Sequence, residues 1–459
     1  MTPTIDELIA KAQKAQEIIE YWPQEKADEM AVAAGWETYK LADEIARLAV
    51  KETGMGLVEH KRVKHQKKTL GVLRDLEGVQ TTGVIEEDLA RGLIKIAKPV
   101  GVIGALTPVT NCEATLPAKA LPALKCRNAI IFAPHPKATK TAQLVTESMR
   151  SGLEKIGAPV DLIQTIETPS IEKAKDLMSK VDLVIATGGS AMVKSAYSSG
   201  TPAYGVGAGN AVVVVDETAD LEAAAEMIFL GKTFDNATSC SSENSVILLD
   251  MIYEKMLENL KKQGGYLCSV DERARLKEVM WPDGLHLNKD IVAQPVKMLA
   301  DMAEISIPGD TTFLMVLGEE IGENDPFCKE KLSLVLTVWR SHSFDEAIQM
   351  VENITGLNGR GHSCGIHTRN EGRVLKLGTR VKASRIMVNQ PHSYGNSGNY
   401  NNGMPFTLTL GCGTWGGNIT TENIHWKHYL NVTWISKPIQ EDIPDDSRLF
   451  GAYWEKYGK

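Results

Sequence analysis

The chain has 459 residues, of which 43% are hydrophobic and 24% are charged, and its formal net charge is −8. This composition is typical of a globular protein with two or three domains and excludes an extensively disordered chain. The acidic balance argues against nucleic acid as the main partner, because phosphate binding favours a basic surface.

The cysteines and the apolar segments indicate the compartment. There are 7 cysteines, an odd number without C-x-x-C pairs, which favours a reducing cytoplasm over a disulfide framework. Residues 1–20 lack the apolar centre of a signal peptide. No run approaches the roughly 20 apolar residues of a membrane span, so we expect no membrane partner.

Residues 4–69 have the spacing of amphipathic helices, with Leu8, Ile9 and Ala12 on one face. Within this region, residues 61–68 (KRVKHQKK) form a basic run. A run of this kind is either a local basic patch or the solvated face of a helix, and we favour the solvated face.

Residues 77–98 alternate like two strands around a turn, which predicts an exposed hairpin suited to subunit contact. The tail from 424 to 435 alternates in the same way. We expect it to pair with the hairpin of a neighbouring subunit, in a homodimer or a homotetramer.

After Pro99 the pattern becomes strand, turn and helix, repeated, and a second series begins near Ala211. Continuous apolar strands separated by helices indicate parallel sheets covered on both faces. The expected fold class is therefore α/β, with two parallel-sheet lobes and a small β element for oligomerisation. The expected division is N-terminal helices that join the cofactor domain (1–76), an oligomerisation hairpin (77–98), a Rossmann-like cofactor-binding domain (99–233), a catalytic domain (234–423), and a C-terminal oligomerisation strand and tail (424–459).

Three turns in the first series have the residues of a ligand site. Thr187-Gly188-Gly189-Ser190 follows a strand and opens a helix, where free backbone N–H groups can hold a phosphate. Asn111 ends a strand at the sheet edge where such folds bind ligands, and its amide either donates to an oxyanion or simply forms a turn. The glycines of 205–210 indicate positive φ, close backbone approach or a tight turn.

Cys240 lies among small polar residues just before an apolar strand. It is either a nucleophile, activated by N–H groups of its loop, or a buried free thiol. His362, Cys364 and His367 suggest a metal, but no fourth ligand is near in sequence, so we expect none. His362 is better interpreted as a structural histidine or as a base for a thiol. Glu330 opens a strand and either binds a ribose hydroxyl or faces solvent.

The order of these features resembles the aldehyde dehydrogenase superfamily over essentially the whole chain, and within it the CoA-acylating branch. The matches are Ala196 to Gly200, Gly205 to Asn210, the Phe234-Asp235-Asn236 lead-in to Cys240, Glu330 to Ser333, and Leu410 to Gly416.

The resemblance implies the chemistry of these residues. Cys240 would attack an aldehyde, Asn111 and the Cys240 backbone N–H would hold the oxyanion, and hydride would pass to the nicotinamide. His362 would line the thiol and assist coenzyme A. Hydrolytic members carry a glutamate before the cysteine strand, and Gly205 occupies that position here. Without that carboxylate, the thioester waits for a thiol such as coenzyme A.

The resemblance also implies the cofactor contacts. The turn at 133–137 lacks the ribose-binding glutamate of many hydrolytic members, and it carries His135 and Lys137, so NADP is favoured over NAD. The expected cofactor contacts are Thr107, Pro108, His135, Lys137, Thr187, Gly188, Gly189, Ser190, Gly207 and Glu330.

Residues 389–402 are crowded with hydrogen-bond donors, and we expect His392, Tyr394, Asn396 and Asn399 to bind substrate. Such a segment suits a small aldehyde with an anionic head, and the overall pattern of the chain is similar to that of the acylating sulfoacetaldehyde dehydrogenases. Acetaldehyde and succinate semialdehyde stay open as substrates, and the same loop could instead contact another subunit. The rival functions are a hydrolytic aldehyde dehydrogenase, an enzyme acting on an acyl phosphate, and a non-catalytic binding protein.

Overall fold

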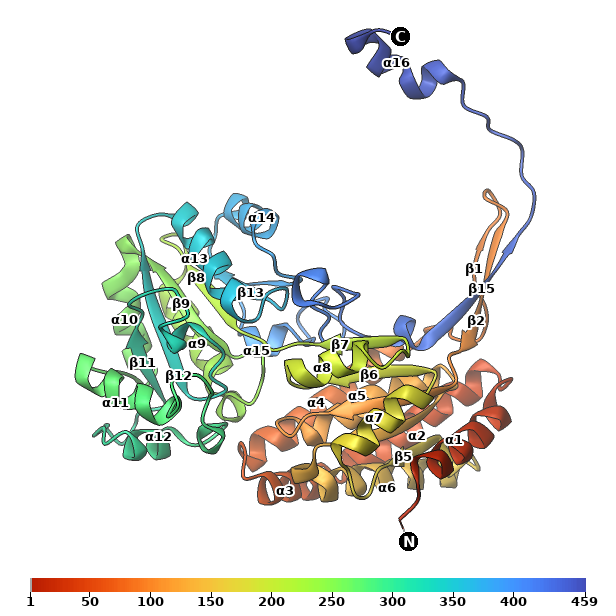
Figure 1. Ribbon diagram of the computed structural model, residues 1–459, viewed down its shortest axis with the longest axis horizontal. Coiled ribbons are helices and arrows are strands. Elements are labelled where there is room, and N and C mark those ends of the chain that lie inside the picture. The colour runs from red at the N-terminus through yellow and green to blue at the C-terminus, as the bar shows by residue number, and fades with distance from the viewer. Residues whose placement is uncertain (1) are drawn as a thin grey trace.

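The computed structural model describes residues 2–459 and has two α/β lobes, a β arm and a C-terminal helix that extends away from the body (Figure 1). Both lobes carry parallel sheets and the arm is antiparallel, which confirms the predicted fold class. Among these residues, no helix is long and apolar enough to cross a membrane.

The first lobe contains a five-stranded parallel sheet in the order β5-β4-β3-β6-β7. Its strands are β3 (Val102–Thr107), β4 (Ala129–Pro134), β5 (Ile163–Thr165), β6 (Leu183–Thr187) and β7 (Ala203–Val206). β3 and β4 are buried along their whole length, as expected for apolar strands covered on both faces. The helices of this lobe are α1 (Ile5–Ile19), α2 (Gln24–Lys40), α3 (Ala42–Thr53), α4 (Val58–Leu76), α5 (Cys112–Lys125), α6 (Thr139–Lys155), α7 (Ile171–Lys180) and α8 (Ser190–Tyr197).

The second lobe contains a seven-stranded parallel sheet in the order β10-β11-β12-β9-β8-β13-β14. Its strands are β8 (Ala211–Val215), β9 (Glu243–Leu249), β10 (Gly265–Leu267), β11 (Phe313–Leu317), β12 (Val335–Ser341), β13 (Cys364–His367) and β14 (Ile386–Val388). Its helices are α9 (Leu221–Thr233), α10 (Tyr253–Lys262), α11 (Val270–Met280), α12 (Val296–Met302), α13 (Phe344–Leu357), α14 (Glu371–Arg380) and α15 (His392–Gly395). Because β8 pairs with β9 and β13, the lobe begins at β8, and the division expected between residues 233 and 234 falls inside it.

The β arm consists of β1 (Gly83–Asp88), β2 (Leu93–Pro99) and β15 (Leu430–Ser436), followed by the projecting helix α16 (Asp446–Tyr457). The predicted hairpin is present as β1 and β2. The expected pairing of the tail with a neighbouring subunit is corrected, because β15 pairs antiparallel with β2 of its own chain. This pairing completes the sheet within one chain.

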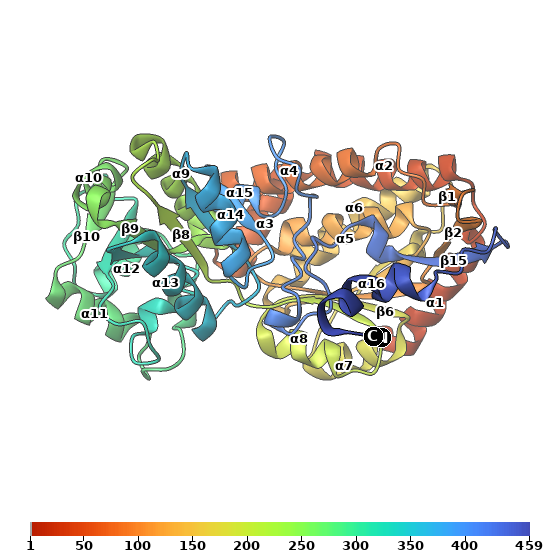
Figure 2. The same cartoon turned by 90° about the horizontal axis from the view of Figure 1, so that it is seen from above.

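The chain passes from the first lobe to the second after β7 and returns after β14, so the two lobes lie side by side with the returning segment against the first (Figure 2). Phe406, Ile424 and Tyr429 of that segment join the apolar core of the first lobe. The side-chain amide of Asn128 donates to the Tyr429 carbonyl at 2.8 Å. These contacts hold the returning segment against the first lobe.

Candidate active site

The two lobes contribute to one cavity of about 230 Å³ at the carboxyl end of the first sheet. The first lobe supplies Asn111, at the N-terminus of α5 directly after β3. The second lobe supplies Cys240, at the end of the loop that leads into β9. The predicted nucleophile and the predicted oxyanion donor therefore line the same space, although they are far apart in the sequence.

The loop that carries Cys240 begins with three residues in a strained backbone conformation, and it packs closely against the backbone of Gly209. Asp235, Asn236 and Ala237 have φ of 51°, 52° and 61°, in the left-handed region, which only a well-supported turn tolerates. A side chain at Gly209 would place its Cβ 1.9 Å from the Cys240 carbonyl oxygen. Of the interpretations of the glycines at 205–210, close backbone approach therefore applies at Gly209.

The thiol of Cys240 lies beside an imidazole. Six of the cysteines are buried, whereas Cys240 is partly exposed to the cavity, and its Sγ lies 3.2 Å from Nε2 of His362. Burial raises the pKa of Cys240 to about 12, and the Glu330 carboxylate adds to this shift. Burial also holds the pKa of His362 well below its usual range. The resting pair is thus a neutral thiol next to a neutral imidazole.

The tautomer of His362 follows from its other contact. Its Nδ1 lies 2.8 Å from Oγ of Ser363, which also accepts a hydrogen bond from the amide of Asn396. If Nδ1–H donates to this hydroxyl oxygen, Nε2 is free to accept the thiol proton. His362 therefore has the position of a base for Cys240.

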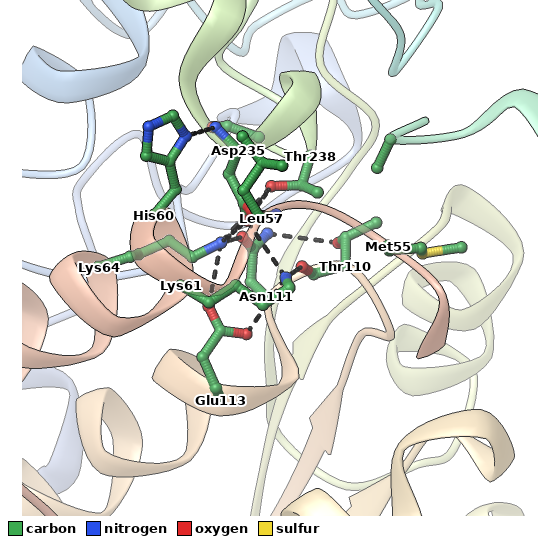
Figure 3. Close-up of polar contacts among 12 residues, drawn as sticks. Met55, Leu57, His60, Lys61, Lys64, Thr110, Asn111, Glu113, Asp235 and Thr238 are labelled. Atoms are coloured by element: carbon green, nitrogen blue, oxygen red, sulfur yellow. Dashed lines mark hydrogen bonds and ion pairs between the residues drawn. The ribbon is translucent and has the colours of Figure 1, made fainter. Parts of the chain in front are cut away.

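Asn111 is held by a lysine (Figure 3). The Lys64 ammonium donates a hydrogen bond of 2.7 Å to Oδ1 of Asn111. The amide nitrogen of Asn111 has one long contact of 3.3 Å, to Oγ1 of Thr110. Within residues 2–459, the backbone N–H of Cys240 has no hydrogen-bond partner. Two donors are thus available for a developing oxyanion.

Lys64 belongs to a buried cluster of four charges: Lys61, Lys64, Glu113 and Asp235 (Figure 3). Lys64 Nζ lies 2.6 Å from Asp235 and 3.0 Å from Glu113. Burial opposes ionisation of Asp235, but the ammonium groups of Lys64 and Lys61 lower its pKa to about 2. The prediction that residues 61–68 are a solvated face was wrong, because Lys61, Lys64 and Lys68 are buried. Carboxylates distant in sequence make the burial of Lys61 and Lys64 tolerable.

Most of the predicted cofactor contacts line the 230 Å³ cavity: Pro108, His135, Thr187, Gly188, Gly189, Gly207 and Glu330. Thr107 is buried at the end of β3, Lys137 is exposed beside His135, and Ser190 opens α8 on an adjoining hollow. Sequence reasoning missed the apolar lining of this cavity, because isolated apolar residues in loops or in a short helix carry no pattern. This lining includes Met192, Leu332, Leu408 and Leu410.

Among the described residues that line this cavity, Glu330 alone carries a carboxyl group. It accepts a hydrogen bond of 3.2 Å from the Gly209 backbone, and burial raises its pKa to about 8. Gly205 does not line the cavity: it is buried in β7, and a Cβ there would lie 2.6 Å from a methyl group of Val193.

The predicted substrate residues separate into two groups. Tyr394 lines a second cavity, of about 130 Å³, that shares Asn111 and Ser239 with the first. His392 and Asn396 are buried behind the cysteine loop, where their side chains bond to Ser241 at 2.7 and 2.8 Å. Asn399 lies in a turn that is closed by Asn402.

The candidate metal ligands do not gather around one point. Within residues 2–459, the one group of three side chains close enough to share an ion is Glu422, His425 and His428, in the loop before β15. His362 instead faces Cys240.

The chain belongs to the aldehyde dehydrogenase family, whose model matches residues 2–273. A sulfoacetaldehyde dehydrogenase from Acholeplasma sp is 49% identical, over 97% of this chain and 93% of that protein. An acylating sulfoacetaldehyde dehydrogenase from Bilophila wadsworthia is 47% identical, over 99% and 100%. An acetylating succinate-semialdehyde dehydrogenase from Clostridium kluyveri is 40% identical, over 98% and 99%.

Solved structures agree with the fold. An acetylating aldehyde dehydrogenase from Geobacillus thermoglucosidasius superposes with a TM-score of 0.93 at 35% identity, covering 96% of this chain and 98% of that one. A propionaldehyde dehydrogenase from Rhodopseudomonas palustris, solved with bound CoA and an acylated cysteine, has a TM-score of 0.86 at 27% identity, covering 95% and 98%. The resemblance to this family extends over nearly the whole chain.

Proposed function

We propose that this protein oxidises a small aldehyde to its acyl-CoA through a thioester on Cys240, with NADP or NAD as the hydride acceptor, and that the aldehyde is sulfoacetaldehyde. The observation that carries the proposal is the placement of Cys240 between the neutral imidazole of His362 and the free donors of Asn111 and its own backbone. The names of the Acholeplasma and Bilophila relatives support the substrate, and the CoA-bound propionaldehyde enzyme supports the acceptor.

The first step uses residues of both lobes. The thiol proton passes to Nε2 of His362 as Sγ forms a bond to the aldehyde carbon, and the carbonyl oxygen becomes an oxyanion. The amide of Asn111 and the Cys240 N–H donate to that oxygen. Because Lys64 holds Oδ1 of Asn111, the amide nitrogen is directed away from the cluster and toward the cavity.

The cofactor fits the wall that the first lobe provides. Gly188 and Gly189 precede the N-terminus of α8 and present backbone rather than side chains to the cavity, which suits a pyrophosphate. Glu330 is placed to accept from a ribose hydroxyl. When bound there, the nicotinamide supplies the acceptor for the hydride that leaves carbon as the oxyanion collapses to a thioester.

The thioester is then released to coenzyme A. A water molecule is a poor nucleophile without a base, and the carboxylate expected in hydrolytic members is replaced by Gly205, which faces Val193. Once His362 has released to solvent the proton that it took from Cys240, the thiol of coenzyme A can give its own proton to Nε2 of His362 and attack the acyl carbon. The Cys240 sulfur then leaves and takes a proton from His362, which restores the Cys240 thiol. The imidazole thus serves both halves of the cycle.

The decisive experiment follows NADPH or NADH formation with and without CoA. With CoA, we expect steady formation of the reduced cofactor. Without CoA, we expect a burst of about one reduced cofactor per Cys240, since the thioester accumulates. Steady formation without CoA would overturn the acylating proposal in favour of hydrolysis. Sulfoacetaldehyde, acetaldehyde and succinate semialdehyde compared in this assay separate the three substrates.

The preference for NADP is supported by the charges around His135. Burial is the main cause that lowers the pKa of His135, and the positive charges of Lys137 and Lys289 lower it further. These cations therefore lie near His135, where the adenosine ribose is expected. We expect Lys137→Glu to lower kcat/KM for NADP relative to NAD by about tenfold, whereas Lys140→Glu, on the exposed start of α6, leaves the ratio unchanged. An unchanged ratio in Lys137→Glu would contradict the preference.

We also propose a homodimer or a homotetramer and a cytoplasmic location. The arm and α16 expose large apolar side chains, among them Trp434, Leu449, Phe450 and Tyr453, which supports contact with another copy. The free state of all seven cysteines supports a reducing compartment. Light scattering on the full chain and on a chain ending at residue 440 tests the assembly: the shorter chain should form smaller species, and equal masses would contradict the role of α16.

A further inference from the structure

The second cavity has two lysines that no carboxylate neutralises. Its wall includes Lys64, Lys67 and Lys68, and no acidic side chain lies on it. Lys64 is neutralised by Asp235 and Glu113. Within residues 2–459, neither Lys67 nor Lys68 has a carboxylate within 4.0 Å, although such groups are costly to bury alone.

The contacts of the two lysines differ. Lys68 is buried and donates to oxygens of Ser397 and Gly398, so its hydrogens are used while its charge is not balanced. Lys67 is half-buried and makes no hydrogen bond through its ammonium group to the described residues. That group lies 4.9 Å from the ring centre of Tyr394 and 5.9 Å from that of Tyr400. Three donors on Lys67 are therefore free.

The position of this cavity relates it to the reaction. It shares Asn111, Thr238 and Ser239 with the cavity that contains Cys240. An aldehyde whose carbonyl oxygen reaches Asn111 would extend its other end toward α4 and Tyr394. The wall also carries neutral polar side chains and the apolar Val63, Phe234 and Leu408, so the lysines are its only cationic groups among the described residues.

We infer that Lys67, with the positive charge of Lys68 behind it, binds the anionic head group of the aldehyde and so determines specificity for a sulfonate. This inference rests on the proposed function and names the residues that would recognise its substrate. A sulfonate separated from the carbonyl by one methylene suits a cavity of about 130 Å³. Burial lowers the pKa of both lysines, and a bound anion would favour their charged forms.

The test compares Lys67→Met with the wild type on sulfoacetaldehyde and on acetaldehyde, which lacks the anionic head. We expect the ratio of kcat/KM for sulfoacetaldehyde to that for acetaldehyde to fall by at least about tenfold, mainly through KM, and Lys67→Arg to recover most of it. The matched control is Arg62→Met, which removes a cation from the same helix outside the cavity. An unchanged ratio in Lys67→Met would overturn the inference.

A second measurement does not depend on turnover. Ethanesulfonate should slow the alkylation of Cys240 by iodoacetamide in the wild type and in Arg62→Met, but much less in Lys67→Met. Propionate as the competitor separates a carboxylate site from a sulfonate site, and stronger protection by propionate would contradict the assignment to a sulfonate. If no aldehyde supports CoA-dependent turnover while ethanesulfonate still protects, the proposed function fails and the anion site stands.

Discussion

The Lys64 ammonium donates a 2.7 Å hydrogen bond to the side-chain oxygen of Asn111, and this contact fixes the orientation of an amide that lines the same cavity as Cys240. An amide that is free to turn would have to reorient before its nitrogen could donate to the oxyanion, whereas a fixed amide is already in place. Lys64 is therefore a positioning residue that acts through Asn111.

Lys64→Met should lower kcat about 10- to 100-fold with little change in the KM for the cofactor. The Asn111 amide is retained in this variant but is no longer held in place, so it donates to the oxyanion in only a fraction of the molecules. Lys61→Met is the control: it disturbs the same charge cluster, but Lys61 bonds to Thr110 and Asp235 and not to Asn111. Steady-state kinetics and thermal unfolding of both variants separate the effects. Equal losses of kcat in the two variants, in proportion to lost stability, would contradict positioning.

Asn111→Ala removes the donor itself. Loss of one oxyanion donor costs about 3–4 kcal/mol, so kcat should fall about 100- to 1000-fold while the fold is retained. Rapid-mixing measurement of the first hydride transfer checks that the chemical step is the one slowed. Near-normal turnover in this variant would show that Asn111 only forms a turn.

The thiol of Cys240 should be protonated in the resting enzyme, because burial and Glu330 raise its pKa to about 12. A raised pKa on an acid keeps the neutral form at ordinary pH, so alkylation by iodoacetamide should accelerate steadily from about pH 7 to about pH 10 without a plateau. Mass spectrometry should locate the adduct on Cys240, since the other cysteines are buried. A plateau near neutral pH would mean that a thiolate exists at rest.

His362→Ala should slow both alkylation and turnover, by about 100-fold for a lost general base. Added imidazole should restore part of the rate, which a purely structural histidine would not permit. His342→Ala, at an exposed position, is the control. Failure of rescue, together with an unchanged alkylation rate, would exclude His362 as the base.

Asp235→Asn should destabilise the protein at neutral pH by roughly 3–5 kcal/mol, because it leaves Lys61 and Lys64 with Glu113 alone. The pKa of Asp235 is lowered to about 2 by these lysines. Its stabilising contribution is thus present above the unfolded-state pKa and is lost as pH falls from about 4 through about 2. Between these pH values, the melting temperature of the wild type should fall more steeply with falling pH than that of the variant. Glu59→Gln, which removes an exposed ion pair of the same helix, should have a small effect.

The sequence predicted the two α/β lobes because their strands are continuous apolar runs between helices, and strand ends such as Asn111 are conspicuous. It did not predict the burial of α4, since Lys61 and Lys64 find their partners Glu113 and Asp235 tens of residues or more away along the chain. No periodicity reports such pairings.

The donor-rich segment 389–402 illustrates the same limit at the candidate site. Local sequence shows that His392 and Asn396 carry donors, but only the folded loop shows that they bond to Ser241 rather than face the cavity. Tyr394 lies between them in sequence and does line the cavity. A short helix turns successive side chains in different directions, so the segment could be found but not its inward-facing members.

Tyr429 has a consequence for how the molecule is made. It is completely enclosed in the core of the first lobe, yet it leaves the ribosome after nearly all of the second lobe. Domains commonly fold in the order of their synthesis, N-terminal first. Here the nascent first lobe keeps an open apolar pocket while the second lobe is translated. The lobe that begins the chain is therefore the last to be finished, and a polypeptide interrupted before residue 429 would carry an unfilled core.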